Sequence, residues 1–129
     1  MTHRFPIRVY YEDTDMAGIV YYANYLRYIE RARSDWVREM GIDQNAMKDD
    51  DGVVFAVRRV EADYLSPAHF DDELVIETNT INVTAARLVM DQVVKRGEEE
   101  LFHAVVTIVC IGESGQAVRL PANIRLMLH

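Results

Sequence analysis

The 129-residue chain has a single cysteine, Cys110, and no apolar run long enough to cross a membrane. One cysteine cannot form an internal disulfide, and its place in the apolar stretch LFHAVVTIVC predicts a buried thiol in a reducing compartment. The N-terminal residues alternate in polarity and lack the apolar block of a signal peptide. We therefore expect a cytoplasmic protein with no membrane span.

The chain also lacks an excess of positive charge, since 14 Lys and Arg residues face 21 Asp and Glu residues, for a formal net charge of -7. A surface that binds nucleic acid needs clustered lysine and arginine, so this balance argues against a nucleic-acid partner. Half of the residues are apolar and 27% are charged, which is typical of a folded globular protein. Without repeats, low-complexity tracts or linkers, we expect one domain over residues 1–129.

Strand patterns account for most of the chain. Residues 4–11 alternate between an apolar and a polar face, with Phe5, Ile7, Val9 and Tyr11 on the same side. After an acidic connector, MKDDDG, turn residues separate further strand-like segments at 53–65, 73–83, 86–96, 100–111 and 116–120. The segment 100–111 is apolar almost throughout and is expected to lie in the interior of a sheet.

One long helix is predicted between the first strand and the others. Apolar side chains recur at helical spacing at Tyr25, Ile29, Ala32, Trp36 and Met40. Ion pairs along the helix are expected between Glu30 and Arg33, Arg31 and Asp35, and Asp35 and Arg38. Gly41 followed by Ile42 is typical of a left-handed C-terminal cap. The whole pattern predicts an α+β fold, with an antiparallel sheet wrapped around one central helix and an outer face that a partner subunit can cover.

Three acids, Glu12, Asp13 and Asp15, lie in the stretch YYEDTDMAGIVYYANY between the first strand and the helix. Their spacing partly resembles a calcium-binding EF-hand loop. That interpretation fails because Ala17 stands at a ligand position and Asn24 stands where a bidentate glutamate is needed. We therefore do not expect calcium at these acids.

Other cofactor sites are not indicated. The four histidines, His3, His69, His103 and His129, have none of the short spacings that place two metal ligands on one face. No glycine-rich phosphate loop leads into the helix. We expect neither a metal nor a redox cofactor.

Two interpretations of the acids stay open at this point. Acids between a strand and a helix often accept hydrogen bonds from backbone N–H groups in a turn. An acid beside the apolar segment MAGIV would instead be partly desolvated, a setting in which a carboxylate can act as a nucleophile or a general base.

The segment YYEDTDMAGIVYYANYLRYIERAR resembles the hotdog-fold acyl-CoA thioesterases of the 4-hydroxybenzoyl-CoA thioesterase type, and it is most similar to the Tol-Pal-associated branch. The likeness continues through VRRVEADYLSPAHFDDELVIET, residues 57–78. The resemblance implies a hotdog fold, which agrees with the α+β pattern described above. It also implies hydrolysis of an acyl-CoA thioester to a carboxylate and free CoA.

The resemblance further implies roles for four residues around the acidic loop. Asp15 is the catalytic carboxylate, which either attacks the thioester carbonyl or activates the water that does. The backbone N–H of Tyr22, at the helix N-terminus, stabilises the developing oxyanion. Gly18 lets the backbone bend closely around the substrate, and Tyr21 contributes to the acyl pocket. The other two acids of the loop take no part in bond breaking.

The phosphates of CoA need basic residues along their route, for which the candidates are Arg58, Arg59 and Arg87. Active sites of the family lie at a dimer interface, so we expect a homodimer or homotetramer in which Asp15 and the CoA-binding residues come from different chains. Glu30, inside ERAR, is interpreted as a helix residue in an ion pair.

The chain departs from the Tol-Pal-associated pattern at Tyr22, where members of that branch often carry histidine. A tyrosine hydroxyl is a poor base there but is able to donate a hydrogen bond. Two other functions stay open: a non-enzymatic hotdog dimer that binds acyl-CoA or acyl carrier protein or serves as an adaptor, and a dehydratase of hydroxyacyl thioesters. The carboxylate at Asp15 favours the hydrolase over the binder, and the absence of histidine from the loop weakens the dehydratase interpretation.

Overall fold

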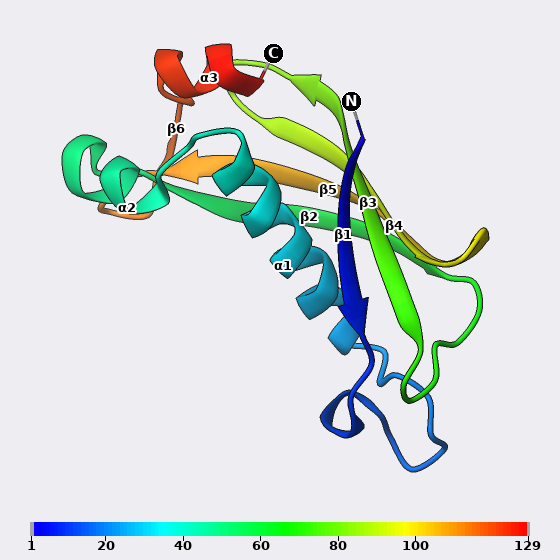
Figure 1. The fold of residues 1–129 in the computed structure, drawn as a ribbon. Helices are drawn as coiled ribbons and strands as arrows, with labels where there is room; N and C mark the ends of the chain where they lie inside the picture. The colour runs from blue at the N-terminus through cyan, green and yellow to red at the C-terminus, as the bar shows by residue number, and fades with distance from the viewer. Residues whose placement is uncertain (1, 129) are drawn as a thin grey trace.

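A computed structural model describes residues 2–128 of the chain. Its helices and strands follow in the order β1 (His3–Arg8), η1 (Tyr11–Asp13), α1 (Asn24–Glu39), α2 (Gln44–Ala46), η2 (Met47–Asp51), β2 (Val54–Tyr64), β3 (Glu73–Val83), β4 (Leu88–Arg96), β5 (Glu99–Ile111), β6 (Ala117–Val118) and α3 (Ala122–Leu128). Figure 1 shows α1 lying across one face of a curved sheet, with the loop before it at one end of the molecule and α3 at the other.

The sheet is antiparallel throughout, in the order β1-β3-β4-β5-β2, with the short β6 paired to β5. β5 lies between β4 and β2, as its continuous apolar sequence predicts. Alternate residues of β3, β4 and β5 are buried against α1, while the residues between them are mostly half-buried on the outer face. The predicted α+β architecture, an antiparallel sheet wrapped around one long helix, is therefore confirmed.

The apolar stripe of α1 forms the centre of the core. Tyr25, Tyr28, Ile29, Ala32 and Trp36 are buried on the side that faces the sheet. The predicted C-terminal cap is confirmed, because Gly41 has a φ of +85° and the N–H of Ile42 donates to the carbonyl of Val37 at 3.2 Å. The single cysteine, Cys110, is buried as expected.

The predicted first strand is too long. It ends at Arg8, and Tyr11 is 79% exposed rather than part of the apolar face. The chain turns here because Asp13 accepts a hydrogen bond from the Tyr10 N–H through Oδ2 and donates its own N–H to the Tyr10 carbonyl. This reciprocal pair stabilises the one-turn helix η1, a contact that alternation in the sequence does not reveal.

Three short helical segments were not predicted. Met47–Asp51 of the acidic connector MKDDDG form η2, which follows directly on α2, and Ala122–Leu128 form α3. Each is too short to show a helical repeat of apolar residues, so tertiary packing decides their conformation.

The ion pairs predicted along α1 are mostly not formed. Within residues 2–128, neither Glu30 with Arg33 nor Arg31 with Asp35 approaches within salt-bridge distance, while Arg38 lies 3.9 Å from Asp35. Glu30 instead accepts a hydrogen bond from the Ser34 hydroxyl at 3.0 Å. The predicted interpretation of Glu30 as an ion-paired helix residue is therefore wrong.

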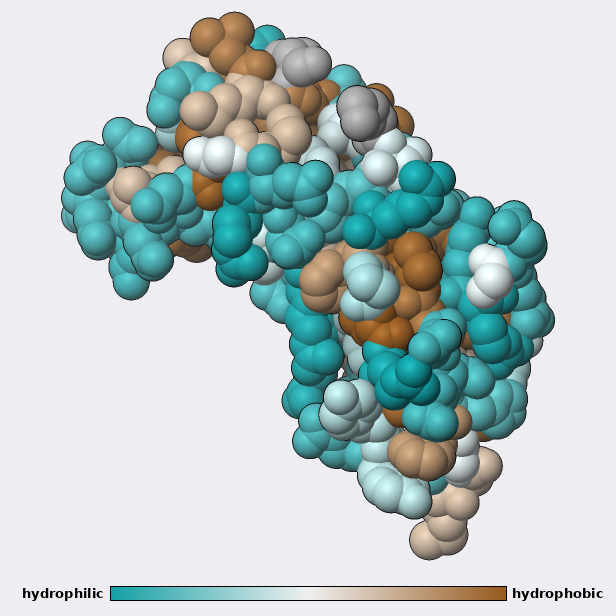
Figure 2. All heavy atoms as spheres, viewed as in Figure 1, coloured by the Kyte–Doolittle hydropathy of each residue, from teal (hydrophilic) through white to brown (hydrophobic). Residues whose placement is uncertain are grey.

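The surface is mixed in character. Figure 2 shows a largely hydrophilic face with two groups of apolar side chains, one near the middle of the face and one at the α3 end, where Leu126 and Met127 are exposed. None of the helices within residues 2–128 combines the length and the apolar character needed to cross a membrane.

Candidate active site

The acidic loop between β1 and α1 is folded by its own backbone. Thr14 and Val20 form an antiparallel bridge, and inside it the Asp15 N–H donates to the Ile19 carbonyl at 2.9 Å. The Gly18 N–H closes the turn on the Asp15 carbonyl at 3.0 Å. Gly18 has a φ of +79°, a conformation that glycine adopts without steric strain. The glycine therefore shapes the turn that carries Asp15.

A second loop, residues 65–72, lies beside the first. The Val20 N–H donates to the Ala68 carbonyl at 2.9 Å, and Ile19 forms a bridge with His69. The Tyr25 hydroxyl, on the first turn of α1, accepts the Ala68 N–H at 3.0 Å. These contacts bring together segments that are more than forty residues apart in the sequence.

The far end of the second loop is held by Asp72. Its Oδ2 accepts the His69 N–H at 2.8 Å and the Arg96 Nη1–H at 2.7 Å. Burial alone would raise the pKa of Asp72, but these hydrogen bonds lower it below its ordinary value. The ionised Asp72 therefore fixes the second loop to β4.

A cavity of about 410 Å³ lies between the two loops and the start of α1. It is lined by Asp15, Ile19, Val20, Tyr21, Tyr22, Tyr25, Tyr64, Leu65, Ser66 and Pro67. Three residues selected from the sequence, Asp15, Tyr21 and Tyr22, thus share one cavity. Its walls are mainly aromatic and aliphatic, which suits an apolar group next to a carboxylate.

The three acids of the loop occupy different environments. Asp13 is 9% exposed and is committed to the η1 turn. Glu12 is exposed and does not line the cavity. Asp15 is exposed toward the cavity side of the loop, and its Oδ1 accepts the Ala17 N–H at 2.9 Å. Both Asp13 and Asp15 therefore accept a backbone N–H in a turn, and of the three acids only Asp15 also lines the cavity.

A backbone donor without an acceptor among the described residues lies just before α1, in a residue that lines the cavity. Among the hydrogen bonds of residues 2–128, the Tyr22 N–H has no acceptor, whereas the Tyr22 carbonyl accepts the Tyr64 hydroxyl at 2.9 Å. Unpaired N–H groups at a helix N-terminus, with the positive end of the helix dipole, favour a negative charge nearby. This arrangement can stabilise an oxyanion.

Aromatic residues behind the cavity stay protonated. Burial raises the pKa of Tyr25, and it raises the pKa of Tyr28, with a further contribution from the neighbouring Asp13 charge. The Tyr28 hydroxyl is buried and has no hydrogen-bond partner among the described residues. Neither phenol is suited to act as a base near neutral pH.

Sequence reasoning missed the wall formed by Tyr64, Leu65, Ser66 and Pro67. These residues belong to VRRVEADYLSPAHFDDELVIET, the second segment of the family resemblance, so a signal was present. Nothing in their local pattern, however, shows that they face the acidic loop.

The basic residues selected for CoA are not brought to Asp15 within one chain. Arg58 and Arg59 are exposed in the middle of β2, and Arg59 pairs with Glu61 at 3.1 Å. Arg87 belongs to the turn between β3 and β4, where Ala85 accepts the Leu120 N–H just before α3; this turn lies at the opposite end of the sheet from the acidic loop (Figure 1). None of the three lines the cavity of Asp15.

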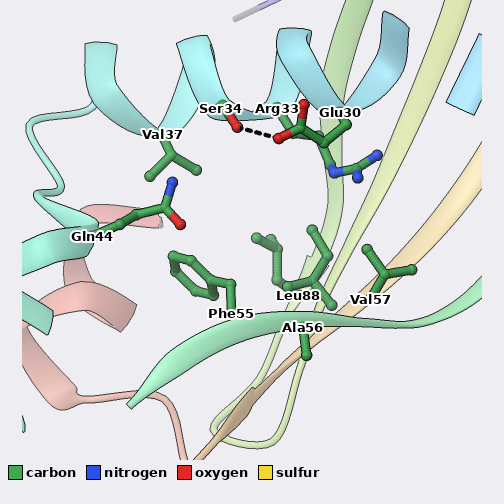
Figure 3. Close-up of a pocket in the computed structure, with 10 residues that line it drawn as sticks. Glu30, Arg33, Ser34, Val37, Gln44, Phe55, Ala56, Val57 and Leu88 are labelled. Carbon is green, nitrogen blue, oxygen red and sulfur yellow. Dashed lines mark hydrogen bonds between the residues drawn. The ribbon is translucent and has the colours of Figure 1, made fainter. Parts of the chain in front are cut away.

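A second cavity, of about 170 Å³, lies further along α1 (Figure 3). Its floor is apolar, with Phe55 and Leu88, and its helix side carries Glu30, Arg33 and Ser34. Burial lowers the pKa of Arg33, which donates to Gln92 at 3.0 Å. The Ser34 hydroxyl donates to Glu30, but no histidine lines this cavity to activate it as a nucleophile.

Comparison with known proteins shows the family of the chain. The thioesterase superfamily matches residues 17–103. The acyl-CoA thioesterase YbgC of Haemophilus influenzae is 34% identical over 126 residues, which is 97% of this chain and 93% of the relative. The crystal structure of a probable thioesterase from Bartonella henselae is 38% identical, covers 94% of this chain and 100% of its own, and superposes with a TM-score of 0.89.

A structure of 4-hydroxybenzoyl-CoA thioesterase in complex with 4-hydroxybenzoyl-CoA is also similar. It superposes with a TM-score of 0.91, covers 99% of both chains and is 22% identical. At this level of identity the likeness shows a shared fold.

Proposed function

Because this chain belongs to the thioesterase superfamily, we propose that it is an acyl-CoA thioester hydrolase in which Asp15 is the catalytic carboxylate. The observation that carries the proposal is that Asp15 and Tyr22 line the same cavity, and that the Tyr22 N–H has no acceptor among the described residues. One supplies the negative charge that drives attack on a carbonyl, and the other supplies the donor that the resulting oxyanion needs.

The reaction converts a thioester and water into a carboxylic acid and free CoA thiol. Asp15 attacks the carbonyl carbon to form an anhydride and release the thiolate, after which water cleaves the anhydride; alternatively, Asp15 takes a proton from water as that water attacks. In both routes the carbonyl oxygen becomes negatively charged, and the Tyr22 N–H donates to it. Tyr21 and the aromatic wall hold the acyl group, and Gly18 sets the turn that presents Asp15.

The test is release of free CoA thiol from a panel of short, medium, long and aromatic acyl-CoAs by the wild type and by Asp15→Asn. The asparagine keeps the shape of the side chain and removes its charge, so we expect turnover to fall by about 10²–10⁴-fold in a folded protein. Glu12→Gln is the matched control, since Glu12 is an exposed acid of the same loop outside the cavity. It should leave turnover unchanged.

The alternative is a hotdog dimer that binds acyl-CoA or acyl carrier protein without hydrolysing it. A binder does not need a carboxylate in the cavity, so the position of Asp15 favours the hydrolase. Tight binding of acyl-CoA without thiol release, by both the wild type and Asp15→Asn, would support the binder.

We further propose a homodimer or homotetramer in which Arg58, Arg59 and Arg87 contact the phosphates of a CoA held at the partner chain's Asp15. Two features support this assembly. β2 is an edge strand that pairs with β5 alone, and eight consecutive residues of it, 57–64, are exposed, including Val57, Val60 and Tyr64. A long exposed edge strand is suited to pairing with another chain.

Mixed dimers test the shared site. An Asp15→Asn chain and an Arg87→Ala chain, each nearly inactive alone, should regain measurable turnover when refolded together, because one site of each heterodimer is then intact. If Asp15 and Arg87 instead act in a site formed by one chain, both sites of the heterodimer are defective and turnover is not regained.

A buried free thiol at Cys110 suits the reducing cytoplasm, the location we propose.

A further inference from the structure

A histidine and two carboxylates meet at the opposite half of α1 from the active site. His3 extends from β1, and its Nε2 lies 2.9 Å from Asp35 Oδ2 and 3.3 Å from Glu39 Oε2. Among residues 2–128, this is the one group of three or more His, Cys, Asp or Glu side chains whose ligand atoms converge closely enough to share a metal ion. The site lies roughly 16 Å along the helix axis from its first residue, well away from the loop of Asp15.

The histidine ring is buried with one nitrogen facing the two carboxylates. Its side chain is 5% exposed, and the ring turns Nε2 toward both carboxylates. The other ring nitrogen, Nδ1, is buried without a hydrogen-bond partner in the described residues. Asp35 and Glu39 are four residues apart on α1, so they project from the same helix face. A buried ring aimed between two carboxylates is a preorganised set of ligands.

The charge of the group also favours a cation. Two carboxylates and a neutral imidazole carry a formal charge of -2. Besides His3, the basic side chain that pairs with these carboxylates among residues 2–128 is Arg38. Its Nη1 is 3.9 Å from Asp35 Oδ1, and its side chain is 79% exposed. Such a distant, solvated arginine neutralises the group only weakly.

The three ligand atoms lie within 4.8 Å of one another, close enough to share one transition-metal ion, although the 2.9 Å distance is also that of an ordinary hydrogen bond. Zinc binds imidazole nitrogen and carboxylate oxygen at about 2.0–2.2 Å in a tetrahedron, which separates neighbouring ligand atoms by roughly 3.3 Å. The observed separations from Nε2 are 2.9 and 3.3 Å. Calcium and magnesium prefer oxygen ligands, so the imidazole selects for zinc-like ions.

We propose that His3, Asp35 and Glu39 bind one divalent transition-metal ion of the Zn²⁺ class, with water completing the coordination on the side of the exposed Glu39. The ion joins β1, which pairs with β3 alone, to the C-terminal half of α1. Its role is structural, because no residue of the active-site cavity belongs to the group. The site could not be predicted from local spacing in the sequence, because His3 and Asp35 are 32 residues apart.

The alternative is that a protonated His3 forms ion pairs with the two carboxylates and no metal binds. The two states respond oppositely to acid. An imidazole that binds a metal must be unprotonated, so lowering the pH releases the ion. An imidazolium ion pair is strengthened by the same change.

The experiment is titration of the metal-free wild-type chain with Zn²⁺ by calorimetry at pH 7.5 and pH 5.5, and with Co²⁺ by visible absorption. We expect one ion per chain, weaker binding at the lower pH, and a Co²⁺ spectrum of nitrogen and oxygen ligands. The midpoint of thermal unfolding should rise with Zn²⁺. Glu39→Gln, an exposed position that is expected to fold normally, should weaken binding at least tenfold, and His3→Gln should abolish the Co²⁺ band.

His103→Gln is the matched control, because His103 pairs with a single carboxylate, Asp91, at 2.5 Å. This variant should bind Zn²⁺ as the wild type does. Absence of binding to the wild type would overturn the proposal. So would binding that survives both His3→Gln and Glu39→Gln, which would mean an adventitious ion only.

Discussion

Two carboxylates of the acidic loop, Asp13 and Asp15, are predicted to have different roles, the first in stability and the second in catalysis. Asp13 is buried, and its Oδ2 accepts the Tyr10 N–H at 2.8 Å. Its carbonyl accepts the Tyr21 N–H at 2.9 Å. Asp15 is exposed and accepts the Ala17 N–H at 2.9 Å. We predict that removing the first side chain destabilises the fold and that removing the charge of the second abolishes turnover.

The magnitudes follow from these contacts. A hydrogen bond to a charged group contributes about 1.5–3 kcal/mol, so Asp13→Ala, which leaves the Tyr10 N–H without its acceptor, should lower the free energy of unfolding by about 2 kcal/mol. Asp13→Asn keeps an acceptor oxygen and loses its charge, a loss of about 1 kcal/mol. Asp15→Asn changes an exposed side chain, with an effect within about 0.5 kcal/mol. A loss of about 1 kcal/mol lowers the thermal unfolding midpoint of a chain of this size by about 4 °C. The midpoint should therefore fall by about 8 °C in Asp13→Ala, about 4 °C in Asp13→Asn and less than about 2 °C in Asp15→Asn.

Urea unfolding followed by circular dichroism measures the free energies, and CoA thiol release measures turnover. Asp13→Asn should keep turnover within about tenfold of the wild type, whereas Asp15→Asn should lose at least about a hundredfold. Equal destabilisation by the two asparagine variants would refute the division of roles. A stable but inactive Asp13→Asn protein would show instead that chemistry depends on the buried acid.

Three further predictions concern hydrogen bonds of the cavity wall, the core and the second loop. Tyr64→Phe removes the donor to the Tyr22 carbonyl. Because this bond is exposed, its loss should change the free energy of unfolding by no more than about 0.5 kcal/mol, or about 2 °C in the thermal midpoint, whereas a loss of about 1 kcal/mol in the positioning of Tyr22 should lower kcat/KM about three- to tenfold. Gln92→Leu removes a fully buried amide with three hydrogen bonds and should lower the free energy of unfolding by about 3 kcal/mol in urea. Arg96→Gln removes a donor that lowers the pKa of Asp72. The stability from the ionised Asp72 is present above the ordinary carboxyl pKa of about 3.9 and is lost as the pH falls through its lowered pKa, so acid unfolding of Arg96→Gln should begin at higher pH.

Each of these predictions has a contrary outcome. Loss of thermal stability in Tyr64→Phe as large as its loss of kcat/KM would mean a packing role for the hydroxyl. A Gln92→Leu protein as stable as the wild type would show that its hydrogen bonds contribute no net free energy. An unchanged acid midpoint in Arg96→Gln, followed by circular dichroism, would mean that Asp72 does not limit acid stability.

Local patterns in the sequence determined much of the framework. The bounds of β3 match the predicted 73–83, and α1 begins one residue before the predicted Tyr25. Burial alternates with period two in the strands, and apolar residues recur at helical spacing in α1. These signals depend on neighbours a few residues apart, so they can be read directly.

The candidate site was predicted only in part. Asp15, Tyr21 and Tyr22 lie within a short segment, and the family resemblance points to them. The opposite wall, with Tyr64 and Pro67, comes from the end of β2 and the loop after it. Its position follows from the sheet order and from the Val20 hydrogen bond to Ala68, which no local pattern encodes.

By itself, the sequence determined the fold class, the place of the long helix and the cap at Gly41, because each depends on residues close together along the chain. Only the tertiary structure decided that Asp13 is buried in a turn while Asp15 faces a cavity. It also decided that Arg87 lies far from Asp15 in the same chain, and that His3 meets Glu39. These outcomes depend on strand register and on packing between distant segments, where a shift of one residue would turn a side chain from the core to solvent.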